Sequence, residues 1–132
     1  MVRAKFISTR GPYSEAQIEI EGRPYYVFDE FSVDAYSMPK FGSDIEFEFS
    51  NFVDANRPWE EIFSSNPEKK IGLEQIEGWK YRAFGRIIGI NPVRVDCGVF
   101  VEECPVNTND DRVVGEYIAF VITRLGGYAH AI

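Results

Sequence analysis

Histidine and cysteine are scarce in this chain. Its 132 residues include one histidine, His130, and two cysteines, Cys97 and Cys104. A structural zinc site normally draws on four such ligands, and a Ser-His or Cys-His pair needs a histidine that is held firmly, whereas chain termini tend to fray. No glycine pattern of a phosphate loop or a dinucleotide fold is present either. We therefore expect no metal, no cofactor and no enzymatic activity.

Long apolar runs are also missing. The longest apolar run without a charge, residues 117–123, is far shorter than the roughly 20 residues that span a bilayer. The first six residues alternate like a strand and contain no apolar run typical of a signal peptide. We expect no membrane segment and a cytoplasmic location.

The two cysteines are expected to be free thiols. They lie seven residues apart in what reads as one strand, which would separate their Cα atoms by roughly 23 Å, beyond the reach of a disulfide. Free thiols agree with a reducing compartment. Because the adjacent Asp96 would raise the pKa of the Cys97 thiol, we interpret Cys97 as a small buried side chain and not as a nucleophile.

Positive charge is in deficit. The chain has 14 Lys and Arg residues against 21 Asp and Glu residues, a formal net charge of −7. Such a field repels phosphate backbones and attracts basic partners. Solubility alone is the alternative explanation for a small domain with surplus carboxylates.

What the chain has in quantity is aromatic and alternating sequence. Aromatic residues make up 15% of it, and apolar and polar residues alternate over many short stretches, as in half-buried strands. In residues 45–49 the alternation places Ile45, Phe47 and Phe49 on one face and Glu46 and Glu48 on the other. Strands are predicted at 4–8, 16–21, 25–28, 45–49, 79–90, 93–102 and 117–125.

Breaks between these strands predict the rest of the fold. Short helices are expected after Asn56 and Asn66, where an Asn is followed by Pro and carboxylates. The pair Gly126-Gly127 predicts a turn that leaves residues 128–130 as a tail or an edge strand. Gly85 and Gly89, on one face of a long strand, indicate a bulge or sharp coiling.

These elements predict a single domain over residues 1–132 of the all-β class, mainly antiparallel. The expected architecture is a small closed or partly closed barrel, similar to an OB-fold, with one or two short helical turns. A two-layer β-sandwich is the alternative. The likeness is one of architecture only, because no motif in the sequence is long enough to name a family.

The first functional hypothesis is a protein-binding module that recognises a basic protein partner. Carboxylates would surround exposed aromatic residues, with charge speeding the encounter and aromatic side chains supplying the hot spots. Immunity proteins that neutralise bacterial toxins are one class with this profile. The candidate contact residues are Asp29, Glu30, Glu46, Glu48, Trp59, Glu60 and Glu61, with Tyr25 and Tyr36 as further aromatic residues.

The second hypothesis is an OB-like domain that binds single-stranded nucleic acid. Such a surface interleaves basic and aromatic side chains, and the stretch 79–86 does so. The net charge opposes it, and cross-strand pairing with Glu102 or Glu116 would also explain the basic residues. Its candidate residues are Lys80, Tyr81, Arg82, Arg86 and Arg94. Exposed edge strands also make a homodimer through strand pairing an open alternative.

Overall fold

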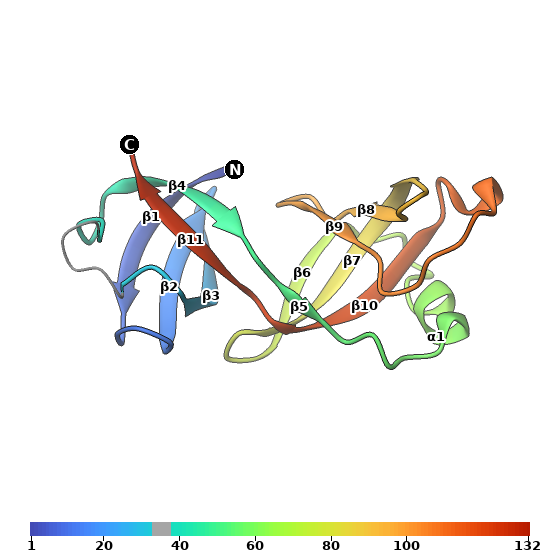
Figure 1. Ribbon diagram of the computed structural model, residues 1–132, viewed down its shortest axis with the longest axis horizontal. Helices are drawn as coiled ribbons and strands as arrows, with labels where there is room; N and C mark the ends of the chain where they lie inside the picture. Colours follow the sequence, from blue (N-terminus) through green and yellow to red (C-terminus); the bar gives the residue numbers. More distant parts are fainter. Residues whose placement is uncertain (33–37) are drawn as a thin grey trace. The chain divides into compact units, whose positions relative to one another are not determined.

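The computed structural model describes residues 1–32 and 38–132, and it confirms a mainly antiparallel all-β fold with a small closed barrel (Figure 1). The backbone contacts divide the chain into two compact units. We call residues 1–52, 76–80 and 123–132 the barrel unit, and residues 53–75 and 81–122 the sheet unit.

Five strands form a closed barrel in the order β1-β2-β3-β11-β4. Strands β4, β1, β2 and β3 lie in Greek-key order, and β11 closes the barrel antiparallel to β4 and parallel to β3. A five-stranded Greek-key barrel is the architecture of the OB-fold, as the sequence predicted. The strands are β1 (Val2–Thr9), β2 (Glu15–Ile20), β3 (Arg23–Asp29), β4 (Asp44–Phe49) and β11 (Gly126–Ala131).

The alternation in the sequence sets which residues fill the barrel. In β4, Ile45 and Phe47 are fully buried while Glu46 and Glu48 point outward, as predicted. The ring of Phe31 packs edge-on against the rings of Phe6 and Phe47, with centroid separations of 5.4 and 6.3 Å. Edge-to-face packing of this kind adds to the free energy gained by burying the rings.

The prediction of a turn at Gly126 and Gly127 was wrong, because both glycines lie inside strand β11. Gly126 and Gly127 pair with Phe28 and Asp29 of β3, and Gly127 also pairs with β4. A Cβ atom added at Gly127 would overlap the carbonyl oxygen of Glu48. Glycine is needed here because the backbones of β4 and β11 come too close for a side chain.

Substituting Gly127 tests this close approach. We expect Gly127→Ala to lower the free energy of unfolding by about 2 kcal/mol more than Gly22→Ala, because overpacking adds to backbone strain. Gly22 is the matched control, since it also has a positive φ, 80°, but has open space around it. Equal losses in urea denaturation would show that β11 does not approach β4 this closely.

The sheet unit is built on an open sheet in the order β5-β10-β7-β8-β9, with β6 also pairing β7. Alternate residues of β7 and β10, among them Ala83, Ile87, Ile118 and Ile122, are fully buried in its core. The elements are β5 (Phe52–Val53), α1 (Trp59–Ser64), β6 (Gly72–Glu77), β7 (Lys80–Gly89), β8 (Arg94–Asp96), β9 (Val101–Glu103), the 3-10 turn η1 (Asp111–Val113) and β10 (Tyr117–Arg124).

Strand β7 bends at its glycines, as the sequence predicted. A Cβ atom at Gly85 would lie 2.5 Å from the carbonyl oxygen of Asp96, so the two backbones approach closely there. The register with β8 shifts between Ile87 and Gly89, which is the expected bulge.

The predicted strand 93–102 is instead a hairpin of β8 and β9. The backbone N–H of Cys97 donates to the carbonyl of Phe100 at 2.9 Å, and Gly98 takes a φ of 88° between them. The carboxylate of Asp96 accepts from the N–H of Gly98 at 2.9 Å, an Asx turn that alternation alone does not reveal.

One of the two predicted helices forms. The helix α1 begins after Pro58 and buries Ile62. No helix follows Asn66, because its side chain accepts from the N–H of Lys70 at 2.8 Å and donates to the carbonyls of Lys70 and Ile118 at 2.9 and 3.1 Å. Over residues 1–32 and 38–132, none of the helices has the length and apolarity needed to cross a membrane.

The prediction of one domain can be tested because each unit holds one tryptophan, Trp59 in the sheet unit and Trp79 in the barrel unit. Strands β5, β6, β7 and β10 each have residues in both units, so we expect the units to unfold together. Urea transitions followed by fluorescence should have the same midpoint in Trp59→Phe and Trp79→Phe variants. Far-UV circular dichroism of the same two variants shows how much each substitution itself shifts the midpoint. A difference between the two fluorescence midpoints that is larger than the difference between the two circular dichroism midpoints would show two domains.

Candidate functional site

Asp29, a predicted contact residue, is fully buried and holds two loops together. Its carboxylate accepts hydrogen bonds from the backbone N–H groups of Phe31 and Ser32, at 2.9 and 2.8 Å, and from the hydroxyls of Ser32 and Thr9. Its carbonyl accepts from the N–H of Tyr13 at 2.8 Å. Asp29 therefore positions the β1–β2 loop that carries Tyr13.

Removing this carboxylate should destabilise the protein. We expect Asp29→Ala to lower the free energy of unfolding by about 2–4 kcal/mol, because it leaves buried donors without an acceptor. Asp29→Asn, which keeps one acceptor oxygen, should cost less. A urea midpoint for Asp29→Ala equal to that of the wild type would exclude the structural role.

Three of the other predicted carboxylates lie on the outside of the barrel unit. Glu46 and Glu48 of β4 face His130 and Tyr128 of β11 across the strand pair. The Glu48 carboxylate is 59% exposed and lies 3.4 Å from Nε2 of His130. Glu30, which follows β3, is 15% exposed in its side chain.

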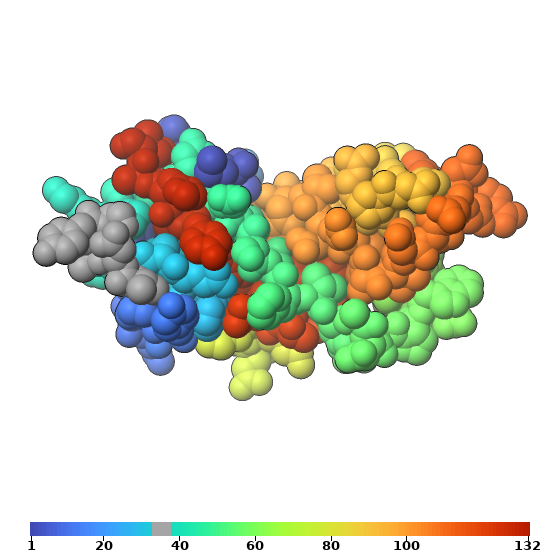
Figure 2. Space-filling model, in the orientation of Figure 1, coloured from blue at the N-terminus to red at the C-terminus, as the bar shows by residue number. Residues whose placement is uncertain are grey.

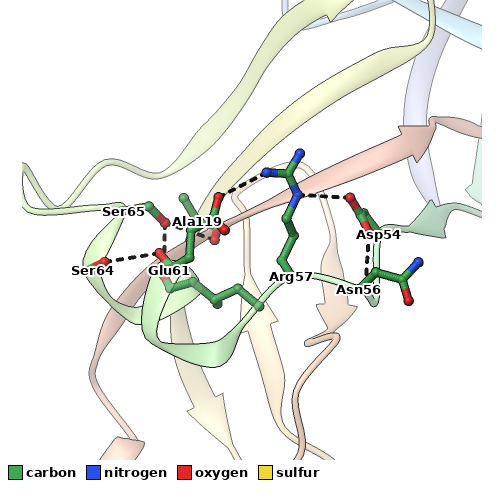
Figure 3. Close-up of polar contacts among 8 residues, drawn as sticks. Asp54, Asn56, Arg57, Glu61, Ser64, Ser65 and Ala119 are labelled. Carbon is green, nitrogen blue, oxygen red and sulfur yellow. Dashed lines mark hydrogen bonds and ion pairs between the residues drawn. The ribbon is translucent and has the colours of Figure 1, made fainter.

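The remaining predicted contact residues, Trp59, Glu60 and Glu61, belong to the sheet unit and lie on α1. Trp59 is 57% exposed and packs edge-on against Phe63. Figure 3 shows how the turn before α1 is held: the guanidinium of Arg57 bonds both Asp54 and Glu61 at 3.1 Å.

These contacts have an electrostatic effect. The hydrogen bond that Arg57 donates to Asp54, followed by the charge of Glu61, raises the pKa of Arg57 above its usual value. The carboxylate of Glu61 is thus already paired.

Of the two additional aromatic residues predicted for the contact surface, Tyr25 is buried at 6% exposure, and Tyr36 lies outside the described residues.

The barrel unit carries an aromatic surface that the sequence did not reveal. The guanidinium carbon of Arg124 lies 4.0 Å from the ring centroid of Phe28 and 3.8 Å from that of Phe52. Phe28 in turn contacts Trp79 and Tyr13, at 5.2 and 6.0 Å between centroids. We call this set, with the neighbouring Tyr128, the aromatic surface: Tyr13, Phe28, Phe52, Trp79, Arg124 and Tyr128.

Half of the aromatic surface is open to solvent. Tyr13 is 63% exposed, Phe52 54% and Tyr128 44%. Figure 2 shows the C-terminal segment that carries Tyr128, coloured red, at the surface of the barrel unit. The members of the aromatic surface come from five separate segments of the chain, so no local sequence pattern could have indicated this surface.

Arg124 is held at the centre of this surface. Its Nη2 atom lies 3.5 Å from Oε1 of Glu30. Its Nε atom is buried and has no hydrogen-bond partner within the described part of the chain. Stacking between two rings and pairing with one carboxylate compensate for this, since a weakly hydrated guanidinium binds well to aromatic faces.

The predicted nucleic-acid residues do not form an aromatic and basic platform. Tyr81 is only 3% exposed, and the nearby Phe84 is covered by the Lys70 side chain, whose Nζ lies 5.2 Å from the ring centroid. Arg86 faces Asp96 across β7 and β8, and Arg94 faces Glu103 across β8 and β9. Lys80 is exposed and Arg82 half-buried.

Both thiols of the sheet unit have raised pKa values because they are buried. Burial, followed by the charges of Glu102 and Asp96, raises the pKa of the fully buried Cys97 to about 12. Cys104 is also a free thiol, and burial raises its pKa. No cluster of metal ligands occurs in residues 1–32 and 38–132. A pocket of about 400 Å³ is lined by Phe63, Ser64, Asn66, Pro67, Lys69, Gly115, Glu116 and Tyr117.

Comparison of the chain with protein-family models, with curated proteins and with solved structures finds no match. The chemistry of the aromatic surface is therefore the basis for assigning a function.

Proposed function

We propose that this chain is a protein-binding module that recognises a basic protein partner through the aromatic surface and the carboxylates beside it. The observation that carries the proposal is the group of exposed Tyr and Phe side chains around Arg124 in the barrel unit. Tyr, Trp and Arg are the residues most enriched in the hot spots of protein interfaces.

The position of the cluster supports the same conclusion. Phe28 lies on β3 and Tyr13 in the β1–β2 loop. OB-folds bind oligonucleotides and oligosaccharides through their second and third strands and this loop, so the position of the cluster supports a binding site and leaves the class of partner to the charges around it. Exposed apolar side chains that gather on one part of a small protein are also typical of interaction sites.

Charge indicates the kind of partner. The barrel unit has seven Lys and Arg residues against ten Asp and Glu residues. Glu30 and Glu48 lie beside the aromatic surface, and Glu46 is two residues along β4 from Glu48. Carboxylates around an aromatic centre favour a basic protein and disfavour a phosphate backbone.

A toxin-neutralising immunity-type protein is one class that fits this proposal, because such a protein is a small acidic domain that binds a basic protein.

A homodimer is a separate proposal. The barrel is closed, so strand pairing between two copies would use the sheet unit, where β5 and β9 end the sheet.

The experiment is a pull-down from the source cell's lysate with mass spectrometry and nucleic-acid staining of the bound material. We expect the wild type to capture a basic protein, and the Tyr13→Ala/Tyr128→Ala variant to capture at least about tenfold less of it. Glu46→Lys/Glu48→Lys should also lose it, because the charge is reversed.

Trp59→Ala is the matched control, since Trp59 is equally exposed but lies on α1 of the sheet unit. It should capture the partner as well as the wild type does. Capture of nucleic acid that disappears in an Arg82→Ala/Arg86→Ala variant would replace the proposal with the nucleic-acid hypothesis. Loss of the partner only with Trp59→Ala would place the binding site on α1.

A further inference from the structure

Two tyrosines and a carboxylate lie together at one side of the aromatic surface. Glu48 of β4 and Tyr128 of β11 are directly opposite each other across their strand pair. Gly127 pairs with Asp29 in the parallel pair of β11 and β3. Tyr128 and Glu30 are the residues that follow this pair, one on each segment.

Tyr13 belongs to the same group. Its backbone N–H is bonded to Asp29, and its ring contacts that of Phe28. The pKa of the Tyr128 hydroxyl is raised, first by its hydrogen bond to Glu30 and that residue's charge, and to a smaller extent by burial, Glu48 and Tyr13. Glu30, Glu48 and Tyr13 therefore all lie near the Tyr128 side chain.

The protein already holds one arginine in a setting of this kind. Arg124 stacks on the rings of Phe28 and Phe52 and pairs with Glu30. Glu30 is thus engaged, since it contacts Arg124 and accepts from the Tyr128 hydroxyl. Glu48 is different, because its carboxylate is exposed and contacts a single ring nitrogen, Nε2 of His130, at 3.4 Å.

We infer that Tyr13, Tyr128 and Glu48 form a binding site for an arginine side chain of the protein partner. This inference rests on the proposed function and adds the group that is recognised. A guanidinium can stack on tyrosine rings and present two N–H donors to one carboxylate, which an ammonium group cannot do in the same plane.

The test is a titration of the 15N-labelled protein with a blocked tripeptide, acetyl-Gly-Arg-Gly-amide, followed by amide chemical shifts. We expect saturable shifts centred on Tyr13, Glu48 and Tyr128. Glu48→Gln should weaken binding by about threefold to fivefold, as expected for one exposed charge pair, and Tyr13→Ala/Tyr128→Ala should abolish it.

Glu19→Gln is the matched control. It makes the same change of charge on the barrel, but on β2, where Glu19 pairs with Lys5 of β1 in the strand register. Equal weakening by Glu19→Gln and Glu48→Gln would overturn the inference, because it would show attraction by net charge alone. The inference would also fail if the same peptide with Lys or Glu at its centre produced the same shifts with equal affinity.

These results are separate from those of the pull-down. A basic protein captured through the aromatic surface, with no shifts from the arginine peptide, would overturn the inference and leave the proposed function intact. Arginine-specific shifts with no protein captured would support the binding site and contradict the proposed function.

Discussion

The insertion of β11 between β3 and β4 is the constraint on which the rest of the barrel unit depends. It closes the barrel and sets His130 and Tyr128 opposite Glu46 and Glu48. The residue before it, Leu125, is fully buried, donates to the carbonyl of Trp79 at 2.8 Å and accepts from the N–H of Phe28 at 2.7 Å. Because Leu125 is fixed in this way, the side chain of the preceding Arg124 lies between the rings of Phe28 and Phe52. The backbone contacts that close the barrel therefore also help to place Arg124 beside Phe28.

The aromatic surface combines a partly buried arginine with exposed aromatic rings beside it. The rings on either side of Arg124 and the carboxylate of Glu30 offset the cost of removing a guanidinium from water. The backbone of Tyr13, at the margin, is held by the buried Asp29, so the loop that carries this residue has little freedom to lose on binding. Preorganised loops bind partners at a lower entropic cost. The buried acidic residue thus serves the surface indirectly, through the loop that it holds.

The sequence pattern predicted the features of this structure that depend on neighbouring residues of one strand. Alternation identified the faces of β4, and the glycines of β7 indicated its bend. The pair Gly126-Gly127 led to a wrong prediction, because two adjacent glycines by themselves indicate a turn. They lie in a strand here because the backbone of Glu48 comes too close for a side chain at Gly127. The prediction that Asp29 is a contact residue failed for a similar reason, because its carboxylate is buried among donors from the end of β1 and from the turn that follows it. The aromatic surface joins segments that are far apart in the sequence and are brought together by the strand pairing of the barrel and of β5 with β10.

The OB-like barrel does not by itself choose between a protein and a nucleic acid as the ligand, because one architecture serves both. A single-strand site requires cations and exposed rings on the same surface. In this chain the rings of Tyr81 and Phe84, which accompany Arg82 and Arg86 on β7, are buried, and the exposed ring of Tyr128 in the barrel unit lies on the residue opposite Glu48. A protein hot spot requires exposed aromatic residues with complementary charge around them, and for a basic partner the barrel unit has both in one place. The distribution of rings relative to charge, more than the fold, is what favours a basic protein.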